Sequence, residues 1–504
     1  MKKKLIAILM ASLCVFLPIL TSCAENPNEG GGDTDIIGGV IGDPNLTEMN
    51  WDGETFLVLT GVDRSEGQAF NIVDLVASED DNLSDPIKKS VFERNSIIKQ
   101  NFNAVIARQP EQDFQTIAND TLAHGEEYGA YMLKVAGALT LSLTGVLLDM
   151  NSEVNYINLN EEWWDTTTID SLAIKNKAFF ALGDINTVDD DATWCVLFNK
   201  ALREQYPSLP NFYDEVKDGN WTIEKLKYWA SKSIIEDNAS GQKWDPNHDY
   251  QYGLFYQDEC ATVLLQASGV TPFRKEKSGK LTPQLGSVEL QTAIDNIREY
   301  FMLENADSER WALNINNIQN QWGGTDVWQD VARGGFKANK ALFFMCHCGS
   351  INLLRDMDND FGILPIPKVT DTQEKYGNTV QYGNATCYTV PFNTPDSDFS
   401  GFMLEAMGYY SSRTFSTTDS LKVAYYETTL QRKGARDDES WDMLDMVFEN
   451  RIFDISCAMN TKGINTLVVT STISNDNAWA TVVAENEEAI RTQIDEDIAH
   501  LMKG

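Results

Sequence analysis

The chain has 504 residues, of which 42% are hydrophobic and 23% are charged, a composition typical of a globular protein. Its formal net charge at pH 7 is −35, and a surface this negative repels phosphate groups, which argues against nucleic acid as a partner. The length exceeds that of one ordinary hydrophobic core, so we expect two lobes.

The N-terminus has the pattern of a bacterial lipoprotein signal. Three lysines precede an apolar run over residues 5–20, which is too short and too interrupted for a good membrane span. The run ends in the sequence LTSC, which resembles a lipobox with Cys23 as the first mature residue. We predict a signal peptide over residues 1–22 and a lipid anchor at Cys23. The anchor would be the protein's one membrane contact, at the extracellular face of the cytoplasmic membrane. An ordinary secretory signal with a chance cysteine is the alternative.

A polar segment separates this cysteine from the globular part. Residues 23–48 are rich in Asn, Asp and Gly and have too little apolar surface to form a core. We expect this segment to be a flexible tether for the lipid-anchored protein.

The globular part opens with a strand, a helix and a second strand. Residues 55–59 form an apolar run, and Asp85 and Pro86 supply the N-cap and the first turn of a helix. Residues 104–106 form the second strand. This order suggests a βαβ unit and an α/β sheet. The helix has one apolar stripe, made of Ile87, Val91, Ile98 and Phe102.

Strands and helices continue to alternate along the chain. Thr222 and Ser287 each precede an apolar stripe with helical spacing, and residues 485–502 resemble a closing amphipathic helix. Buried strands are expected at three apolar runs, residues 177–182, 194–198 and 341–345. The pattern predicts an α/β protein with two lobes.

Six of the eight cysteines lie in the globular part at irregular spacing. A small disulfide scaffold would be denser in cysteine, so we expect mostly unpaired, buried thiols. Cys346, His347 and Cys348 could be read as metal ligands. In a strand, however, His347 faces away from the two cysteines, so the three cannot converge on one ion. We expect neither a metal nor another cofactor.

Residues 237–249 are rich in Asp and Asn and resemble a calcium-binding loop. Counted from Asp245, Tyr250 and Tyr256 stand where the loop needs Gly and Glu, so the ligand spacing is broken. We interpret the segment as an oxygen-rich loop, with bound calcium as the alternative.

Several segments, in their order along the chain, carry a family resemblance: residues 163–165 (WWD) with 174–181, 193–200 (TWCVLFNK), 219–222 (GNWT), and 336–344 with 361–367 (FGILPIP). This ordered set resembles the extracellular solute-binding proteins of the maltose-binding type. Residues 436–439 and 448–451 resemble a subgroup common in lipoproteins of anaerobic gut bacteria. The resemblance implies a two-lobed periplasmic-binding-protein fold of type II, with a ligand cleft between lobes that hinge crossings join.

The resemblance also implies domain organisation and function. Lobe 1 is expected at residues 49–192 with 365–420, and lobe 2 at residues 193–364 with 421–504. The protein would be a monomeric, non-enzymatic component of an ABC importer. It would capture a carbohydrate, a mono- or oligosaccharide, in the cleft and deliver it to permease subunits in the membrane.

A sugar-binding cleft needs flat aromatic platforms for the C–H faces of the ring and fixed polar partners for its hydroxyls. Trp163 and Trp164 fall where the family places a stacking aromatic, and Asp165 beside them could accept hydroxyl hydrogen bonds. The alternatives are a buried pair of core tryptophans and a helix N-cap at Asp165.

Further candidates lie around the predicted crossing between the lobes. Asp63 and Arg64 follow the first strand, where the family places polar ligand contacts, and an ion pair or a solvated loop is the alternative. Asp184 leaves a buried run just before the crossing, and Trp194 would line the hinge.

The second lobe supplies three more candidates. Tyr256 could stack on a sugar and Glu259 could bind a diol, with a surface loop as the alternative. The family often has an aromatic after the strand at residues 341–345, where this chain has Cys346 and His347. That departure leaves His347 as the cleft-facing candidate there.

Two other functions stay open. A surface glycosidase would act on polysaccharide with two cleft carboxylates, and the same fold could bind a peptide or another non-sugar ligand. Few basic residues fall at the predicted cleft, which argues against an anionic solute.

We expect Cys23→Ser to abolish lipidation, because the hydroxyl cannot replace the thiol that carries the diacyl group. The variant should be released from membranes or accumulate as the unprocessed precursor, as judged by membrane fractionation and by the mass of the mature chain. Normal processing together with unchanged membrane retention would exclude a lipobox.

Overall fold

The computed structural model describes residues 46, 49–64, 68–121, 123, 127–235, 250–301, 311–319, 324, 326–414, 418–473 and 478–501. The predicted signal peptide, Cys23, the tether apart from Leu46, and residues 237–249 of the candidate calcium loop lie outside this part of the chain. Within it, no helix combines the length and the apolar character that a membrane crossing requires.

The first sheet has four strands in the order β11-β3-β1-β2. β1 (Glu54–Gly61) is parallel to β2 (Ala104–Glu111) and to β3 (Ala130–Lys134), and β11 (Thr386–Thr389) is antiparallel to β3. The two strands predicted first in the chain are confirmed. With the helix between them they form the predicted βαβ unit.

The helix between β1 and β2 begins as predicted. α1 (Pro86–Phe102) has Asp85 as its N-cap, whose carboxylate accepts hydrogen bonds from the amides of Ile87 at 2.9 Å and Lys88 at 3.2 Å. A cap of this kind contributes about 0.5–2 kcal/mol, because it satisfies amides that have no partner within the helix. The stripe that faces the sheet contains the predicted Ile87, Val91, Ile98 and Phe102.

Other helices pack on the first sheet. α15 (Ser397–Ser411) packs against α1 and β1, and α2 (Phe114–Asn119) contacts β1. α3 (Val135–Ser142) contacts β3 and β11, and α4 (Thr166–Leu172) follows it in the chain.

The second sheet has five strands in the order β10-β4-β9-β5-β8. Their bounds are β4 (Trp194–Asn199), β5 (Tyr252–Tyr256), β8 (Ala312–Asn314), β9 (Ala341–His347) and β10 (Phe361–Leu364). β5 is parallel to β8 and β9, whereas β4 is antiparallel to β9 and β10. The strands predicted over residues 194–198 and 341–345 are confirmed.

Helices surround the second sheet, and a small hairpin lies among them. The elements before β9 are α6 (Lys200–Gln205), α7 (Phe212–Lys217), α8 (Ile223–Ala230), α9 (Cys260–Ala267), the hairpin β6 (Phe273–Lys275) and β7 (Leu281–Pro283), α10 (Val288–Phe301), α12 (Ile315–Gln319), the π-helix η1 (Trp328–Arg333) and α13 (Gly334–Lys337). The later ones are α14 (Gly349–Leu353), α16 (Leu421–Val423), the π-helix η2 (Ala424–Gly434), α17 (Asp438–Glu449), α18 (Ile455–Met459), η3 (Thr461–Gly463), α19 (Ile464–Thr472) and α20 (Trp479–Leu501).

Three helices expected from sequence are present. Thr222 accepts a hydrogen bond from the amide of Lys225 at the start of α8, and Ser287 accepts one from the amide of Leu290 in the first turn of α10. The predicted closing helix is α20, which begins earlier than expected, at Trp479.

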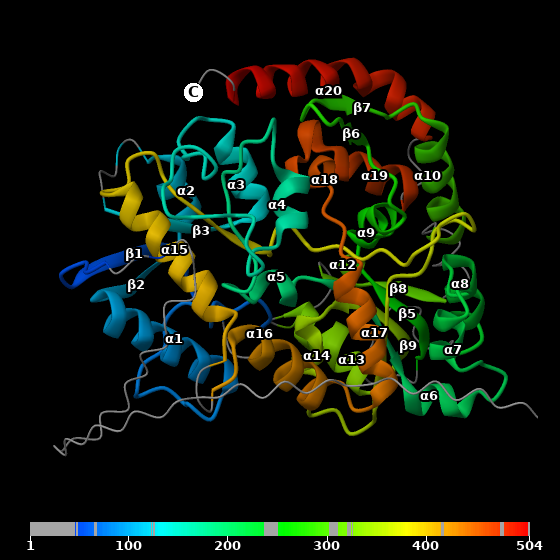
Figure 1. Ribbon diagram of the computed structural model, residues 1–504. Coiled ribbons are helices and arrows are strands. Elements are labelled where there is room, and N and C mark those ends of the chain that lie inside the picture. The colour runs from blue at the N-terminus through cyan, green and yellow to red at the C-terminus, as the bar shows by residue number, and fades with distance from the viewer. Residues whose placement is uncertain are drawn as a thin grey trace, which may run out of the picture. The chain divides into compact units, whose positions relative to one another are not determined.

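The chain passes between the two sheets in three of its described segments. It enters the second sheet at β4, returns between β10 and β11, and passes again between α15 and α17, which packs on β10. The short helix α5 (Val188–Asp191) lies at this junction and contacts both β11 and α14. Figure 1 shows it between the blue and cyan strands of the first sheet and the green strands of the second.

The strand expected over residues 177–182 is wrong. The run is buried, but it pairs only through isolated bridges, Ile174 with Lys177 and Ala181 with Tyr388. An apolar run shows that a segment is buried. Whether it becomes a strand depends on continuous pairing with distant residues, and here the run meets the outer side of β11 at one position only.

All six cysteines in the described part of the chain are buried and unpaired. This confirms the expectation of free thiols. Among the described residues, no group of three or more His, Cys, Asp or Glu side chains has the arrangement of a metal site.

Candidate functional site

Two of the cavities between segments of the two sheets and their helices contain residues predicted to bind ligand. The small cavity has a volume of about 230 Å³ and the large cavity one of about 460 Å³. They have no lining residue in common.

The small cavity is lined by residues at the carboxyl ends of parallel strands from both sheets. Arg64 and Phe70 follow β1, Tyr256 ends β5 and Glu259 follows it, and His347 ends β9. In open α/β sheets, ligands bind in the crevice outside these strand ends. The lining is completed by η1 and the segment before β11, with Trp328, Arg333, Gln381 and Asn384.

Two contacts cross the small cavity. Gln68 Nε2 donates to Asp326 Oδ2 at 3.1 Å, which joins the loop after β1 to the residues that begin η1. The ring of Phe70, from the same loop, meets His347 edge to face with ring centroids 5.1 Å apart. The loop that leaves the first sheet is thus held against the second.

The small cavity also contains buried polar atoms of two titratable side chains, His347 and Glu259. Burial lowers the pKa of His347 to about 3, so its imidazole is neutral at neutral pH, and burial raises the pKa of Glu259. His347 Nε2 and Glu259 Oε2 are buried and have no hydrogen-bond partner among the described residues. Because buried polar groups in folded proteins normally have partners, these two atoms are well placed to bond a ligand.

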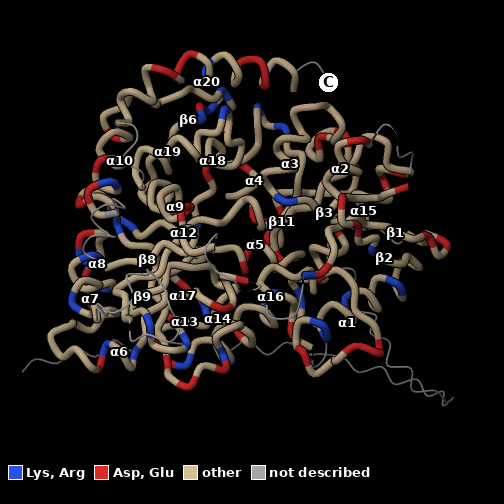
Figure 2. Tube along the Cα trace, turned by 180° about the vertical axis from the view of Figure 1, so that it is seen from behind, with Lys and Arg blue, Asp and Glu red and all other residues tan. Residues whose placement is uncertain are grey.

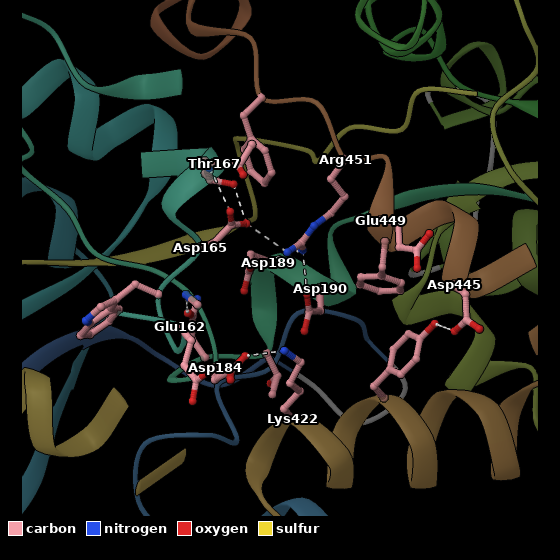
Figure 3. A pocket seen from close by; sticks show the side chains of 18 residues that line it. Glu162, Asp165, Thr167, Asp184, Asp189, Asp190, Lys422, Asp445, Glu449 and Arg451 are labelled. Atoms are coloured by element: carbon pink, nitrogen blue, oxygen red, sulfur yellow. Dashed lines mark hydrogen bonds and ion pairs between the residues drawn. The ribbon is translucent and has the colours of Figure 1, made fainter. Parts of the chain in front are cut away.

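The large cavity is organised around Arg451, which follows α17 (Figure 3). Its guanidinium donates to Asp190 Oδ1 at 2.7 Å, to Asp165 Oδ2 at 3.2 Å and to Asp189 Oδ2 at 3.4 Å. Asp165 caps α4 by accepting from the amide of Thr168, and the other two aspartates belong to α5. One side chain therefore ties the end of α17 to α4 and to the crossing.

A second ion pair closes the opposite side of the large cavity. Lys422 Nζ lies 3.3 Å from Asp184 Oδ1, and burial raises the pKa of Asp184. Carboxylates outnumber cations in this lining, which holds Lys422 and Arg451 against Glu162, Asp165, Asp184, Asp189, Asp190, Asp445 and Glu449. The large cavity is acidic.

The last residue of α5, Asp191, is hydrogen-bonded to η2. Tyr425 donates its hydroxyl to Asp191 Oδ1 at 2.8 Å, and Gly349 leaves room for the carboxyl, since a Cβ there would lie 3.2 Å from Asp191 Cγ. Burial raises the pKa of Asp191 to about 7 and that of Asp190 to about 6.

No protein-family model and no curated protein matches the chain. Solved structures do. An ABC substrate-binding protein from Listeria monocytogenes, in complex with cycloalternan, matches with a TM-score of 0.54 and 12% identity over 88% of this chain and 100% of that one. The GacH receptor of Streptomyces glaucescens, solved unliganded and with acarbose, gives 0.51 and 11% over 88% and 99%. Maltose-bound MalE3 of T. maritima gives 0.50 and 14% over 89% and 99%.

The chain has the two-lobed fold of ABC substrate-binding proteins. This confirms the fold class predicted from sequence. In this binding-protein fold, the small cavity occupies the edge where the chain leaves the sheets of both lobes.

The binding-protein fold divides the predicted site residues between the two cavities. Arg64, Tyr256, Glu259 and His347 line the small one, whereas Trp164, Asp165 and Asp184 line the large one. Asp63 lies in neither lining and pairs with Arg108 at 2.9 Å, which is the ion pair held open as its alternative. Trp194 is buried behind His347, with ring centroids 4.2 Å apart. Ligand contact by any of these residues stays a prediction.

The paired tryptophans pack on the first lobe. Trp163 and Trp164 are 2% and 3% exposed, and Gly408 of α15 makes room for both rings. Trp164 Nε1 donates to Glu405 Oε2 at 3.1 Å. Gly183 pairs with Trp164 at φ +152°, where a Cβ would lie 2.3 Å from the Trp163 carbonyl oxygen. This packing is that of a structural pair, with Trp164 at the wall of the large cavity.

Sequence reasoning missed two parts of the small cavity's lining, one on η1 before β9 and one in the segment before β11. Trp328 and Arg333 lie on η1, whereas the resemblance placed the cleft aromatic after β9. Gln381 and Asn384 lie on the return segment, beyond the residues that carried the resemblance there. No local pattern separates these side chains from ordinary surface residues.

We expect Trp164→Ala to destabilise the protein by about 3–5 kcal/mol, because it removes a large buried side chain and leaves a cavity. Urea denaturation followed by far-UV circular dichroism measures the loss. Tyr228→Ala is the control, since Tyr228 is 54% exposed on α8. Equal midpoints for both variants would contradict a structural role for Trp164.

Asp191→Asn should flatten the pH dependence of stability. The raised pKa of Asp191 means that the folded state holds this proton more tightly than the unfolded chain, so stability falls as the pH rises from about 4 to about 7. The amide keeps an acceptor for Tyr425 and cannot ionise. Urea midpoints at pH 4.5 and 7.5 should differ less in the variant than in the wild type. The exposed Asp371→Asn should behave as wild type, and an unchanged pH dependence in Asp191→Asn would refute the effect.

Proposed function

We propose that this protein is the extracellular solute-binding lipoprotein of an ABC importer. It captures a carbohydrate in the small cavity between its lobes and delivers it to permease subunits in the membrane. The observation that carries the proposal is the lining of that cavity, which comes from the strand ends of both sheets and from the return segment that joins them.

The chemistry of the small cavity suits a sugar. Phe70 and Trp328 offer aromatic surface for the C–H face of a ring. Gln381 and Asn384 supply amides that both donate and accept, and the buried Nε2 of His347 adds a polar atom without a partner among the described residues. A hydroxyl-rich ligand needs this combination.

The contacts across the small cavity support a mechanism of lobe closure. The hydrogen bond from Gln68 to Asp326 and the contact of Phe70 with His347 each join the loop after β1 to the second lobe. Opening the cavity would break both. A ligand that touches both sides favours the closed arrangement, because only a difference in affinity between two states shifts their equilibrium.

The structural neighbours agree with a carbohydrate ligand. Their bound molecules are cycloalternan, acarbose and maltose, and each belongs to a protein of the same fold. The lobes proposed here are residues 49–192 with 365–420 and residues 193–364 with 421–504, which assign each sheet to one lobe. The lipid anchor rests on the sequence around Cys23.

A binding role accounts for the small cavity better than the glycosidase considered above. A glycosidase needs two carboxyl groups free to act on the bond. The two in this lining are Glu259 and Asp326, and both oxygens of Asp326 already accept hydrogen bonds from Gln68 and from the amides of Trp328 and Gln329. We propose that the sugar leaves the protein unchanged.

Trp328→Ala should weaken carbohydrate binding by about 2–4 kcal/mol, because an aromatic that is desolvated at the centre of a site contributes this much. Thermal-shift screening against mono- and oligosaccharides finds the ligand, since a ligand at 100-fold its Kd stabilises by about 2.7 kcal/mol. Calorimetry then compares the variants. Tyr228→Ala, remote from the cavity, should bind as wild type, and normal affinity in Trp328→Ala would remove the small cavity as the site. Release of a smaller sugar product would refute a pure binding role.

A further inference from the structure

The charged residues that line the small cavity are balanced in number, unlike those of the acidic chain as a whole. The net charge is −35, and Figure 2 shows that acidic residues are spread over many elements, α20 among them. Carboxylates also dominate the large cavity. The small cavity is instead lined by two arginines, Arg64 and Arg333, from opposite lobes. Arg333, on η1, is a basic residue that the sequence did not place at the cleft.

Arg64 is held at the cavity wall by contacts that use only part of its N–H donors. One Nη2–H donates to Asn384 Oδ1 at 2.7 Å, and the guanidinium lies over the ring of Phe70 at 5.2 Å from its centroid. A guanidinium carries five N–H donors in a planar fork. The contact with Asn384 therefore positions the fork and leaves other donors for a ligand.

The second arginine and a lysine add positive charge at the same place. Arg333 is 8% exposed, and its charge and that of Arg64 both reinforce the effect of burial in lowering the pKa of His347. Lys134, at the end of β3, has its pKa lowered by burial and then by Arg64. Two arginines from different parts of the chain thus act on one histidine, and Lys134 acts on one of these arginines.

The lining also holds two carboxyl groups, which equal the two arginines in number. Asp326 is engaged as an acceptor by Trp328, Gln329 and Gln68. Burial raises the pKa of Glu259, because desolvation disfavours the charged form of a carboxyl group.

We propose that the small cavity recognises an acidic sugar, whose carboxylate is bound by Arg64 and Arg333 while its ring packs on Trp328. This rests on the proposed function, since it takes the small cavity to be a carbohydrate site. Arginine forks match the two oxygens of a carboxylate, and His347 Nε2 and Glu259 Oε2 remain for ring hydroxyls. The volume of about 230 Å³ is below the range of about 300–1,000 Å³ usual for ligand pockets, so the cavity encloses one acidic unit of the ligand.

The test compares sugars that differ only in the acid group. Glucuronate, galacturonate, mannuronate and their homodimers are paired with glucose, galactose, mannose and the corresponding neutral dimers. Succinate serves as a carboxylate without a sugar ring. Thermal shift ranks the probes on the full mature chain, and calorimetry gives Kd. At least one acid should bind about tenfold or more tightly than its neutral partner, since a charge-assisted hydrogen bond contributes about 1.5–3 kcal/mol.

Two variants assign the carboxylate contact to these arginines. Arg64→Gln, at an exposed position, should weaken the acid by about 10–100-fold and its neutral partner by much less. Arg333→Lys keeps the charge at a buried position and loses the fork, so it should weaken the acid as well. Arg491→Gln is the matched control, because Arg491 is exposed on α20 and pairs there with Glu487.

The outcomes separate this inference from the proposed function. Neutral sugars that bind as tightly as the acids, or acid binding that survives in both variants, would refute acid recognition and leave a carbohydrate carrier. Stabilisation by no sugar of either class, or by succinate alone, would refute the carbohydrate function itself.

Discussion

The structure depends on one half-buried charge, the guanidinium of Arg451. Three carboxylates share it, and they come from the cap of α4 and from α5 at the crossing. A cation that is largely withdrawn from water is stabilised by pairing and hydrogen bonding, and removal of one partner from such a group is destabilising. The Arg451 network therefore fixes the position of the crossing between the lobes, which the return segment and the last helices must then follow.

The small cavity owes its shape to that fixed crossing. Asp74, from the loop that follows β1, accepts the amide of Thr187 at 2.6 Å next to α5. Phe70, four residues before Asp74, meets His347 at the end of β9. The loop that carries Arg64 and Phe70, which line the small cavity, is thus anchored to the junction at one end. Its other end stays near Arg64, where the two lobes meet across a cavity instead of a packed core.

The sequence predicted those features that are determined by residues close together in the chain. The cap at Asp85 and the stripe on α1 depend on neighbouring residues, and both are present. β4 and β9 were found because their apolar runs are short and bounded. The run over residues 177–182 has the same apolar pattern, but it does not form a strand. Strand formation there depends on continuous pairing with β11, which lies more than two hundred residues away in the chain. The site was only partly predictable for the same reason. His347 and Glu259 sit at strand ends that the resemblance located, whereas Trp328 and Arg333 are brought in by the fold of η1.

The buried thiols have a consequence for how such a chain must mature. Cys195 of β4 lies opposite Cys346 of β9 in the second sheet, and Cys348 follows two residues later, yet none of them is oxidised. Burial raises the pKa of Cys260, Cys457 and Cys387, which suppresses the thiolate form that oxidants attack. The folded protein thus protects these thiols, whereas the unfolded chain exposes all six to oxidants. For the exported protein proposed above, oxidation of these thiols would be confined to the interval between export and folding.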